Sequence, residues 1–266
     1  MKKLFALAIL ASLSKTMVAQ DTSATRNDRE QRKLERRQKI NTIARQEEEG
    51  ILVYNKQSIF GLMLRTDGYG IFYELGKMRT TRKTTTYDLE LTEIKDPKEE
   101  KLPNGGFSFG NPYVYGKINN FYQLKLGVGQ QYILGDKGNK NGVAVSALYN
   151  GGLSLGFLRP YYIQVEDVYG NIQTIKYSQD TSLFLNGYIH GGGGLGKGWG
   201  EMKFRPGVYA KTGLRFDYGR FNEVVSALEV GISAEAYAQK IPIMLYQKER
   251  QLFFQGYITL EFGRRK

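Results

Sequence analysis

The sequence predicts an all-β protein: an antiparallel transmembrane β-barrel of eight strands, with ten as the alternative, preceded by a short charged helix or tether. Three observations predict this fold. The chain begins with an export signal, and no later apolar run is long enough for a transmembrane helix. Apolar and polar residues alternate with period two over segments of 11 to 15 residues. The long connections between these segments fall on one side of the expected sheet.

The first 19 residues are the expected signal peptide. Met1-Lys2-Lys3 supplies a positive start, residues 4–13 are apolar, and Val18-Ala19-Gln20 offers a small-residue cleavage site. Ten apolar residues are too few for a transmembrane helix, which needs about 20. Cleavage after Ala19 removes three lysines and lowers the net charge from +12 to +9.

Composition excludes several kinds of chemistry. The chain has no Cys and one His, so disulfides, thiolate metal sites and a two-His zinc site within the chain are excluded. It has 32 Gly and 19 Tyr but only 6 Pro, which favours many strands over helices. The basic excess is spread over the expected turns and loops. We therefore expect no cofactor, no metal and no nucleic-acid partner.

Residues 20–55 form a separate charged segment, expected in the periplasm. Residues 26–49 contain no Gly, Pro or aromatic residue, and most positions are charged or amide. Leu34, Ile40 and Ile43 would form only a thin apolar stripe on a helix. The segment is therefore either a helix that binds a periplasmic partner or a solvated, partly helical tether.

Residues 56–263 are the expected barrel, and residues 264–266 a basic periplasmic tail. Asp67-Gly68 predicts a tight hairpin between the first two strands, and a shift of alternation at Asn150-Gly151-Gly152 predicts a bulge. The eight expected strands cover residues 58–65, 69–78, 84–93, 121–133, 143–155, 204–218, 224–237 and 252–262.

The length and polarity of the longer strands favour a barrel over a soluble sandwich. Strands of 11 to 15 residues exceed the usual ~5–6 of globular sheets and are long enough for a bilayer crossing of about 9–11 residues. Full charges lie on the polar faces, which indicates an apolar outside and a polar inside. A sandwich would turn the apolar face inward instead.

The lengths of the connections between strands independently indicate a transmembrane barrel. The longest connections, near residues 95–119 and 157–202, are the third and fifth, and a medium one near 239–250 is the seventh. In an eight-stranded barrel with both termini in the periplasm, odd-numbered connections are extracellular and periplasmic turns are short. Every long connection is therefore expected outside the cell.

Alternation places a set of charged side chains inside the expected barrel. Because the acids and bases nearly cancel, we expect them to pair and to fill the lumen, with a conducting pore as the alternative. The expected contacts are Lys211 or Arg215 with Glu229 or Glu235, and Glu261 with Arg65 across the closing seam. The full set is Arg65, Glu74, Asp88, Glu90, Lys125, Arg205, Lys211, Arg215, Glu229, Glu235 and Glu261.

The C-terminal strand carries a family resemblance. Gly256-Tyr257-Ile258-Thr259-Leu260-Glu261-Phe262 resembles the C-terminal β-signal of outer-membrane proteins, although Gly263-Arg264-Arg265-Lys266 follow its last aromatic residue. The resemblance implies location in the outer membrane and recognition by the barrel assembly machinery through Gly256, Tyr257, Ile258, Leu260 and Phe262. With Gln20 after the cleavage site, the chain also resembles Bacteroidetes-type outer-membrane barrels of unassigned function.

Signals for an enzyme are weak. Residues 190–198 match G-x-x-x-x-G-K superficially, but Gly198 stands where a phosphate loop needs Ser or Thr. His190 is the single imidazole base, with Ser178, Asp180 and Ser182 nearby in sequence. Small barrels that modify lipid A use His with Ser, so such an enzyme is the third hypothesis.

The sequence thus predicts a non-enzymatic outer-membrane barrel with a structural or interaction role, such as an accessory subunit of a larger envelope assembly. The second hypothesis is a barrel that binds or transports a lipid or hydrophobic small molecule. The expected partners are outer-membrane lipids including lipopolysaccharide, the assembly machinery, and an envelope protein bound through residues 20–50.

Overall fold

The computed structural model describes residues 30–35, 37–38, 54–103, 112–138, 142–219 and 223–266. The chain divides into two units, Met1–Glu49 and Gly50–Lys266. In the first unit, residues 30–35 and 37–38 are helical and exposed, within the segment for which a charged helix or tether is predicted. The predicted signal peptide lies outside the described residues.

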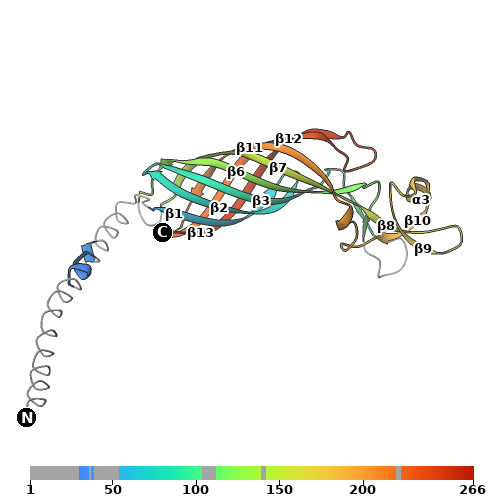
Figure 1. Ribbon diagram of the computed structural model, residues 1–266, viewed down its shortest axis with the longest axis horizontal. Helices are drawn as coiled ribbons and strands as arrows, with labels where there is room; N and C mark the ends of the chain where they lie inside the picture. The colour runs from blue at the N-terminus through green and yellow to red at the C-terminus, as the bar shows by residue number, and fades with distance from the viewer. Residues whose placement is uncertain (1–29, 36, 39–53, 104–111, 139–141, 220–222) are drawn as a thin grey trace, which may run out of the picture. The chain divides into compact units, whose positions relative to one another are not determined.

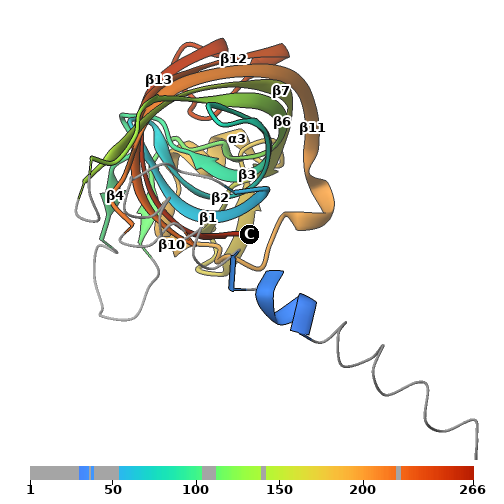
Figure 2. The same ribbon diagram turned by 90° about the vertical axis from the view of Figure 1, so that its left-hand side faces the viewer.

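Eight antiparallel strands of the second unit close into a barrel, seen along its length in Figure 1 and end-on in Figure 2. Their order around the ring is β1-β13-β12-β11-β7-β6-β3-β2, so the prediction of eight strands is confirmed. The strands are β1 (Lys56–Arg65), β2 (Gly68–Thr80), β3 (Lys83–Ile94), β6 (Asn119–Gly135), β7 (Ala144–Pro160), β11 (Lys203–Asp217), β12 (Val224–Ile241) and β13 (Arg250–Arg265).

The two ends of the barrel differ. The turns β2–β3, β6–β7 and β11–β12 lie at one end, here called the turn end, where the chain also enters β1 and leaves β13. The connections of residues 95–118, 161–202 and 242–249 lie at the other, here called the loop end, together with the tight β1–β2 turn. All the long connections therefore share one end, as their lengths predict.

Closure of the barrel uses the last residues of the chain. β1 pairs with β13 from Gln57 opposite Arg265 to Arg65 opposite Tyr257. The amide N of Lys56 donates to the carbonyl O of Lys266, and that of Lys266 donates back to Lys56, both over 2.8 Å. Residues 264–266 are therefore part of the closing seam, and the prediction of a basic tail there is wrong. Tyr54, expected in the charged segment, is also buried at the turn end.

Side chains alternate between the two faces of the barrel wall. On β1, Leu62 and Leu64 point outward and are 50% and 67% exposed, whereas Ile59 and Met63 point inward and are buried. The other strands alternate in the same way: exposed apolar residues cover the outside, and the inside holds buried charged residues together with buried apolar ones. This arrangement is that of a transmembrane β-barrel.

The bulge predicted at Asn150-Gly151-Gly152 is absent from β7, which is described over its whole length. The register of β7 runs without a shift against β11 and across these three residues against β6. The apparent change of alternation comes from Leu148, an apolar side chain that points inward and is 2% exposed.

Inward glycines make room for inward tyrosine rings. A Cβ at Gly127 would collide with the Tyr209 hydroxyl, and one at Gly231 would lie 2.6 Å from the Tyr257 ring. Both tyrosines bind carboxylates inside the barrel. Glycine at these positions therefore allows an aromatic ring and an ion pair to share one narrow cross-section.

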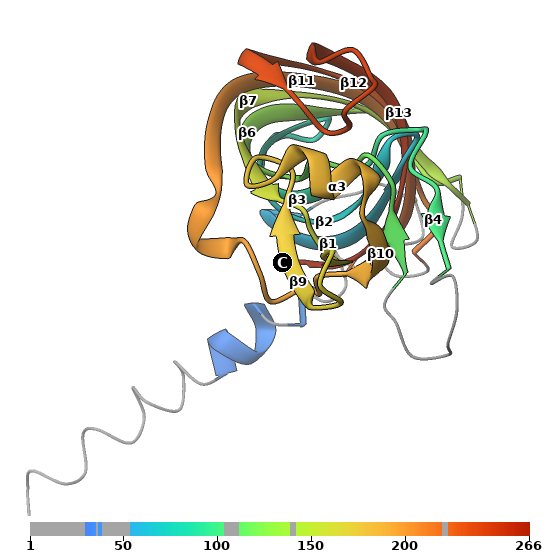
Figure 3. The same ribbon diagram turned by 90° about the vertical axis from the view of Figure 1, so that its right-hand side faces the viewer.

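The loop end carries additional structure, shown in Figure 3. The connection of residues 161–202 forms a separate three-stranded sheet of order β10-β8-β9 with a short helix, so its strands do not extend the barrel to ten. These elements are β8 (Tyr162–Glu166), β9 (Ile172–Lys176), α3 (Thr181–Asn186), β10 (Tyr188–Gly192) and the 3-10 turn η1 (Trp199–Glu201). The connection of residues 95–118 adds the small pair β4 (Lys101–Leu102) and β5 (Tyr113–Val114).

The closing seam generates a prediction about two adjacent arginines. Arg265 is 4% exposed and its Nη2 lies 2.5 Å from Asp217 Oδ2, whereas Arg264 is exposed. Arg265→Ala leaves Asp217 with one weaker partner, and breaking a buried pair costs about 3–5 kcal/mol. We expect this variant to lose its folded gel mobility at a clearly lower temperature than wild type. Arg264→Ala is the matched control, and equal losses in the two variants would contradict the assignment.

Candidate functional site

Ten of the eleven charged residues expected in the lumen are buried inside the barrel. Each is at most 8% exposed, and each has a charged or hydrogen-bonding partner there. Arg205 is the exception. It stands at an inward position of the alternation, but it lies near the loop end of β11 and is only half-buried. It forms no ion pair with any described residue. These ten are Arg65, Glu74, Asp88, Glu90, Lys125, Lys211, Arg215, Glu229, Glu235 and Glu261.

Arg215 lies at the centre of the cluster nearer the turn end. Its guanidinium lies 2.8 Å from Glu74, 2.9 Å from Glu229 and 2.6 Å from Glu261. These carboxylates come from β2, β12 and β13, and β2 is diametrically opposite β11 in the ring. Tyr257 donates to Glu229 over 2.7 Å, and Gln57 donates to Glu74 over 3.0 Å. One side chain on β11 thus braces the barrel across its whole width.

A second cluster lies nearer the loop end. Lys211 binds Glu90 and lies 3.7 Å from Asp88, both on β3. Lys125 binds Glu235 and lies 3.5 Å from Glu90, which links β6 to β3 and β12. Arg65 completes the cluster, at 2.9 Å from Glu235 and 3.1 Å from Asp67. Because each base contacts two acids, the charges form a continuous network rather than isolated pairs.

The expected pairings are met only in part. Arg215 does bind Glu229, its direct neighbour in the β11–β12 register. Lys211 binds Glu90 and Asp88 across the lumen instead of Glu229 or Glu235. The Glu261–Arg65 contact is wrong, because β1 places Gly61 opposite Glu261 and Arg65 opposite Tyr257.

The charged residues predicted for the lumen do not include the neutral members of the network or three charged residues at the turn end, Asp217, Arg265 and Lys137. Gln123 donates to Glu235 and to the Tyr237 hydroxyl, and Asn150 donates to Asp88 over 3.1 Å. The sequence does indicate that they face the lumen, because Gln123 and Asn150 stand at the same alternating positions of their strands as the inward charged residues. At the turn end, Asp217 binds Arg265 at 2.5 Å and Lys137 at 3.5 Å.

Both ends of the lumen are covered by side chains. At the turn end, Tyr54 hydrogen-bonds Thr84 over 2.8 Å and packs under the Arg265 guanidinium, 5.0 Å from the ring centre. At the loop end, an apolar cluster covers the network, and the connection of residues 242–249 lies across it through backbone hydrogen bonds to residues 116–119. The cluster consists of Ile94, Phe121, Leu158, Tyr237, Ile241, Ile243 and Phe253.

The sheet β8–β9–β10 with α3, here called the loop-end module, has its own small core. Ile163, Val165, Ile175 and Phe184 are each at most 4% exposed. Asp180 caps α3 by accepting a hydrogen bond from the Leu183 amide over 2.9 Å. The module is therefore a folded unit rather than an irregular loop.

The hairpin between β8 and β9 presents apolar side chains at its tip. Val168 and Tyr169 are 90% and 86% exposed. The Asp167 carboxylate holds the turn by accepting from the amides of Tyr169 and Asn171 over 2.8 and 2.9 Å. These hydrogen bonds, that from Asn171 foremost, hold the pKa of Asp167 below its usual range. The tip is thus an ordered apolar projection.

The geometry gives little support to hydrolytic chemistry. His190 Nε2 lies 2.8 Å from Glu166 Oε2 and its ring packs edge-on against Tyr188. Asp180, considered as a partner for His190, is occupied as the cap of α3. Residues 190–198 lead from β10 into η1, not from a strand into a helix that could cradle phosphate.

The described ranges contain no group of three or more acidic or His side chains arranged to hold a metal ion. No helix within those ranges is long and apolar enough to span a membrane.

The Arg215 cluster generates a direct prediction. Arg215→Met leaves three buried carboxylates without their shared cation, and removing one partner of a buried ion pair costs about 3–5 kcal/mol. We expect the variant to unfold at a much lower urea concentration than wild type in detergent, or to fail to assemble. Arg205→Met on the same strand is the control, because Arg205 has no ion pair to lose and should cost under about 1 kcal/mol. Equal unfolding midpoints for both variants would contradict the bracing role of Arg215.

Comparison with known proteins gives distant structural similarities. No protein-family profile and no curated protein matches the sequence. Neisserial surface protein A is 11% identical with a TM-score of 0.36, over 79% of this chain and 96% of that one. Ail, the attachment invasion locus protein of Yersinia pestis, is 11% identical with a TM-score of 0.35, over 80% and 100%. The N-terminal β-barrel domain of Pseudomonas aeruginosa OprF is 11% identical with a TM-score of 0.35, over 79% and 98%.

Proposed function

We propose that this chain is an outer-membrane barrel with an interaction role, in which the barrel anchors the loop-end module and the module binds a protein partner outside the cell. The apolar outer wall supports insertion in a bilayer. Short turns at one end and long connections at the other are the usual asymmetry of outer-membrane barrels. In this proposal the loop end lies outside the cell, and residues 20–50 lie in the periplasm as a second candidate contact for an envelope protein.

The observation that carries the proposal is the hairpin tip of the loop-end module. Val168, Tyr169 and Ile172 are 90%, 86% and 59% exposed, although the module has a core that could bury apolar side chains. Tyr is among the residues that contribute most to protein interfaces. The Asp167 hydrogen bonds fix the turn before binding, which lowers the entropy lost on association.

The filled lumen supports the proposal that the barrel is an anchor for the loop-end module. The network and the two covering layers leave the interior occupied by side chains. The eight-stranded barrel is therefore a scaffold in this proposal rather than a channel, and the proposed role is non-enzymatic, with His190 held by Glu166 and Asp180 capping α3. Rim cations such as Lys197 and Lys248 face the side on which lipopolysaccharide phosphates would be found.

The proposed orientation is testable because the chain has no native Cys. Val168→Cys at the hairpin tip should react with a membrane-impermeant maleimide on intact cells. Gly138→Cys, at the exposed β6–β7 turn where a side chain meets nothing within 4 Å, should react only after the outer membrane is permeabilised. The reverse pattern would invert the topology, and equal reaction of both in unbroken cells would argue against a membrane barrel.

The interaction role is tested at the tip itself. A photoreactive amino acid at Ile172 should give a discrete protein adduct on intact cells. Tyr169→Ser should then lower the adduct yield, because losing a Tyr anchor of about 1–2 kcal/mol weakens binding roughly 5–30-fold. Tyr246→Ser is the matched control, since Tyr246 is 71% exposed in the connection of residues 242–249, outside the module. An adduct yield that is indifferent to Tyr169→Ser would remove the tip from the proposed interface.

A further inference from the structure

The barrel wall has a notch at the loop end where the β1–β2 hairpin stops short. β13 pairs with β1 only from Tyr257 onward, and the last bond across this seam runs from the Thr66 amide to the Gly256 carbonyl over 3.0 Å. Residues 250–255 of β13 therefore have no β1 neighbour. The segment of residues 95–97 bounds the opposite side, fixed by the Lys95 amide donating to the Asp67 carbonyl over 2.7 Å. We call this gap the lateral notch.

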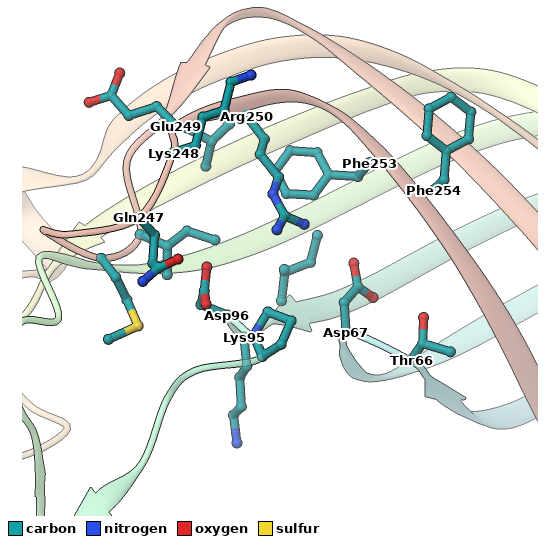
Figure 4. A pocket seen from close by; sticks show the side chains of 15 residues that line it. Thr66, Asp67, Lys95, Asp96, Gln247, Lys248, Glu249, Arg250, Phe253 and Phe254 are labelled. Carbon is teal, nitrogen blue, oxygen red and sulfur yellow. The ribbon is translucent and has the colours of Figure 1, made fainter.

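A cavity of about 190 Å³ occupies the lateral notch (Figure 4). Its inner wall consists of Ile94, Ile241, Ile243 and Phe253, which belong to the apolar cluster over the lumen. The volume equals that of roughly six water-sized groups of about 30 Å³ each. The cavity can therefore take a head group or a short chain segment, but not a whole lipid.

Arg250 is an exposed cation in the cavity lining that forms no ion pair with any described residue. Figure 4 shows the Arg250 guanidinium directed into the space beside Phe253, while the charged ends of Lys95 and Glu249 point away. Asp67 is paired with Arg65 at 3.1 Å, and Asp96 accepts from the Lys98 amide over 3.0 Å. Lys248 also lines the cavity, but Arg250 is the residue whose guanidinium lies beside Phe253, so we take it as the group available to an anion.

An apolar groove on the outer wall meets the lateral notch. Thr66 and Phe254 line both hollows. The groove crosses four neighbouring strands, β7, β11, β12 and β13, at a level where their outward residues are small. The small residues are Gly151, Ala210, Ala234 and Gly256, and the larger ones beside them are Tyr149, Ile232 and Phe254. Its volume of about 830 Å³ equals some 28 water-sized groups, enough for an acyl chain.

We propose that the lateral notch and the groove form a binding site for one phosphate-bearing lipid, with its phosphate on Arg250 and an acyl chain in the groove. The proposal rests on the membrane insertion stated under the proposed function, which brings lipid to this wall. Guanidinium groups bind phosphate through paired, charge-assisted hydrogen bonds. An apolar groove that ends at a free guanidinium matches a lipid, which has an anionic phosphate at one end and an apolar chain at the other.

The test is native mass spectrometry of the full mature protein released from mild detergent, with defined lipids added. We expect one phosphatidylglycerol to remain bound per barrel, and a diacylglycerol glycoside with the same chains to bind about tenfold less, since a charge-assisted contact is worth about 1.5 kcal/mol or more. Arg250→Gln should lower phosphatidylglycerol retention by a similar factor. Lys240→Gln, at another exposed cation on β12, should leave it unchanged.

The groove is tested separately. Gly151→Leu fills it from the outer face, and an added Cβ at Gly151 meets only the Tyr209 carbonyl at 3.4 Å, so the barrel should tolerate the change. We expect lost retention in Gly151→Leu and normal retention in Ala147→Leu, four residues earlier on the same outward face of β7.

Three outcomes would overturn the site: equal retention in Arg250→Gln and wild type, equal binding of the glycoside, or displacement of the lipid by inorganic phosphate alone. Heat-modifiable gel mobility of each variant is recorded in parallel. Its loss in wild type would count against the membrane barrel itself, whereas intact mobility with unselective lipid binding would count against the site alone.

Discussion

Every charge enclosed by this barrel has to be matched by an opposite charge or a hydrogen bond, and the structure is organised around that constraint. Removing an ion from water costs several kcal/mol even after relaxation. Exposed apolar side chains cover the outer face, so the alternating strands place most of their polar residues inside. Arg215 shows the solution: one guanidinium serves three carboxylates from strands around the ring. The lumen therefore acts as a polar core.

The same network determines what the rest of the molecule can do. Ion pairs between β11 and β2, and between β6 and β12, connect strands that share no backbone hydrogen bonds. With the wall braced from inside, the loop end is free to carry a separately folded module and a shortened β1–β2 hairpin. The module supplies an exposed tip, and the short hairpin leaves the lateral notch with Arg250 directed into it. The two proposed binding sites thus lie at the same end of the barrel.

Much of the architecture could be predicted from the sequence because period-two alternation reports directly on which face a residue occupies. It identified eight strands and placed ten of eleven charged residues inside. It could not assign partners, since Lys211 meets Glu90 across the lumen, where distance depends on ring order and strand stagger. Arg205 shows a second limit: alternation predicts whether a side chain faces inward or outward, but not where it lies along the barrel axis. The loop-end module was missed because its strands have only five residues each.

The central claim is that side chains fill the lumen and make the barrel a scaffold. Its most direct test is ion conduction by purified, refolded protein in planar lipid bilayers. The network of Arg215, Lys211, Lys125 and their carboxylates predicts that inserted protein gives no stepwise conductance. Reproducible unitary steps from wild-type protein would contradict a filled lumen and would restore the conducting pore as the better account of these charges.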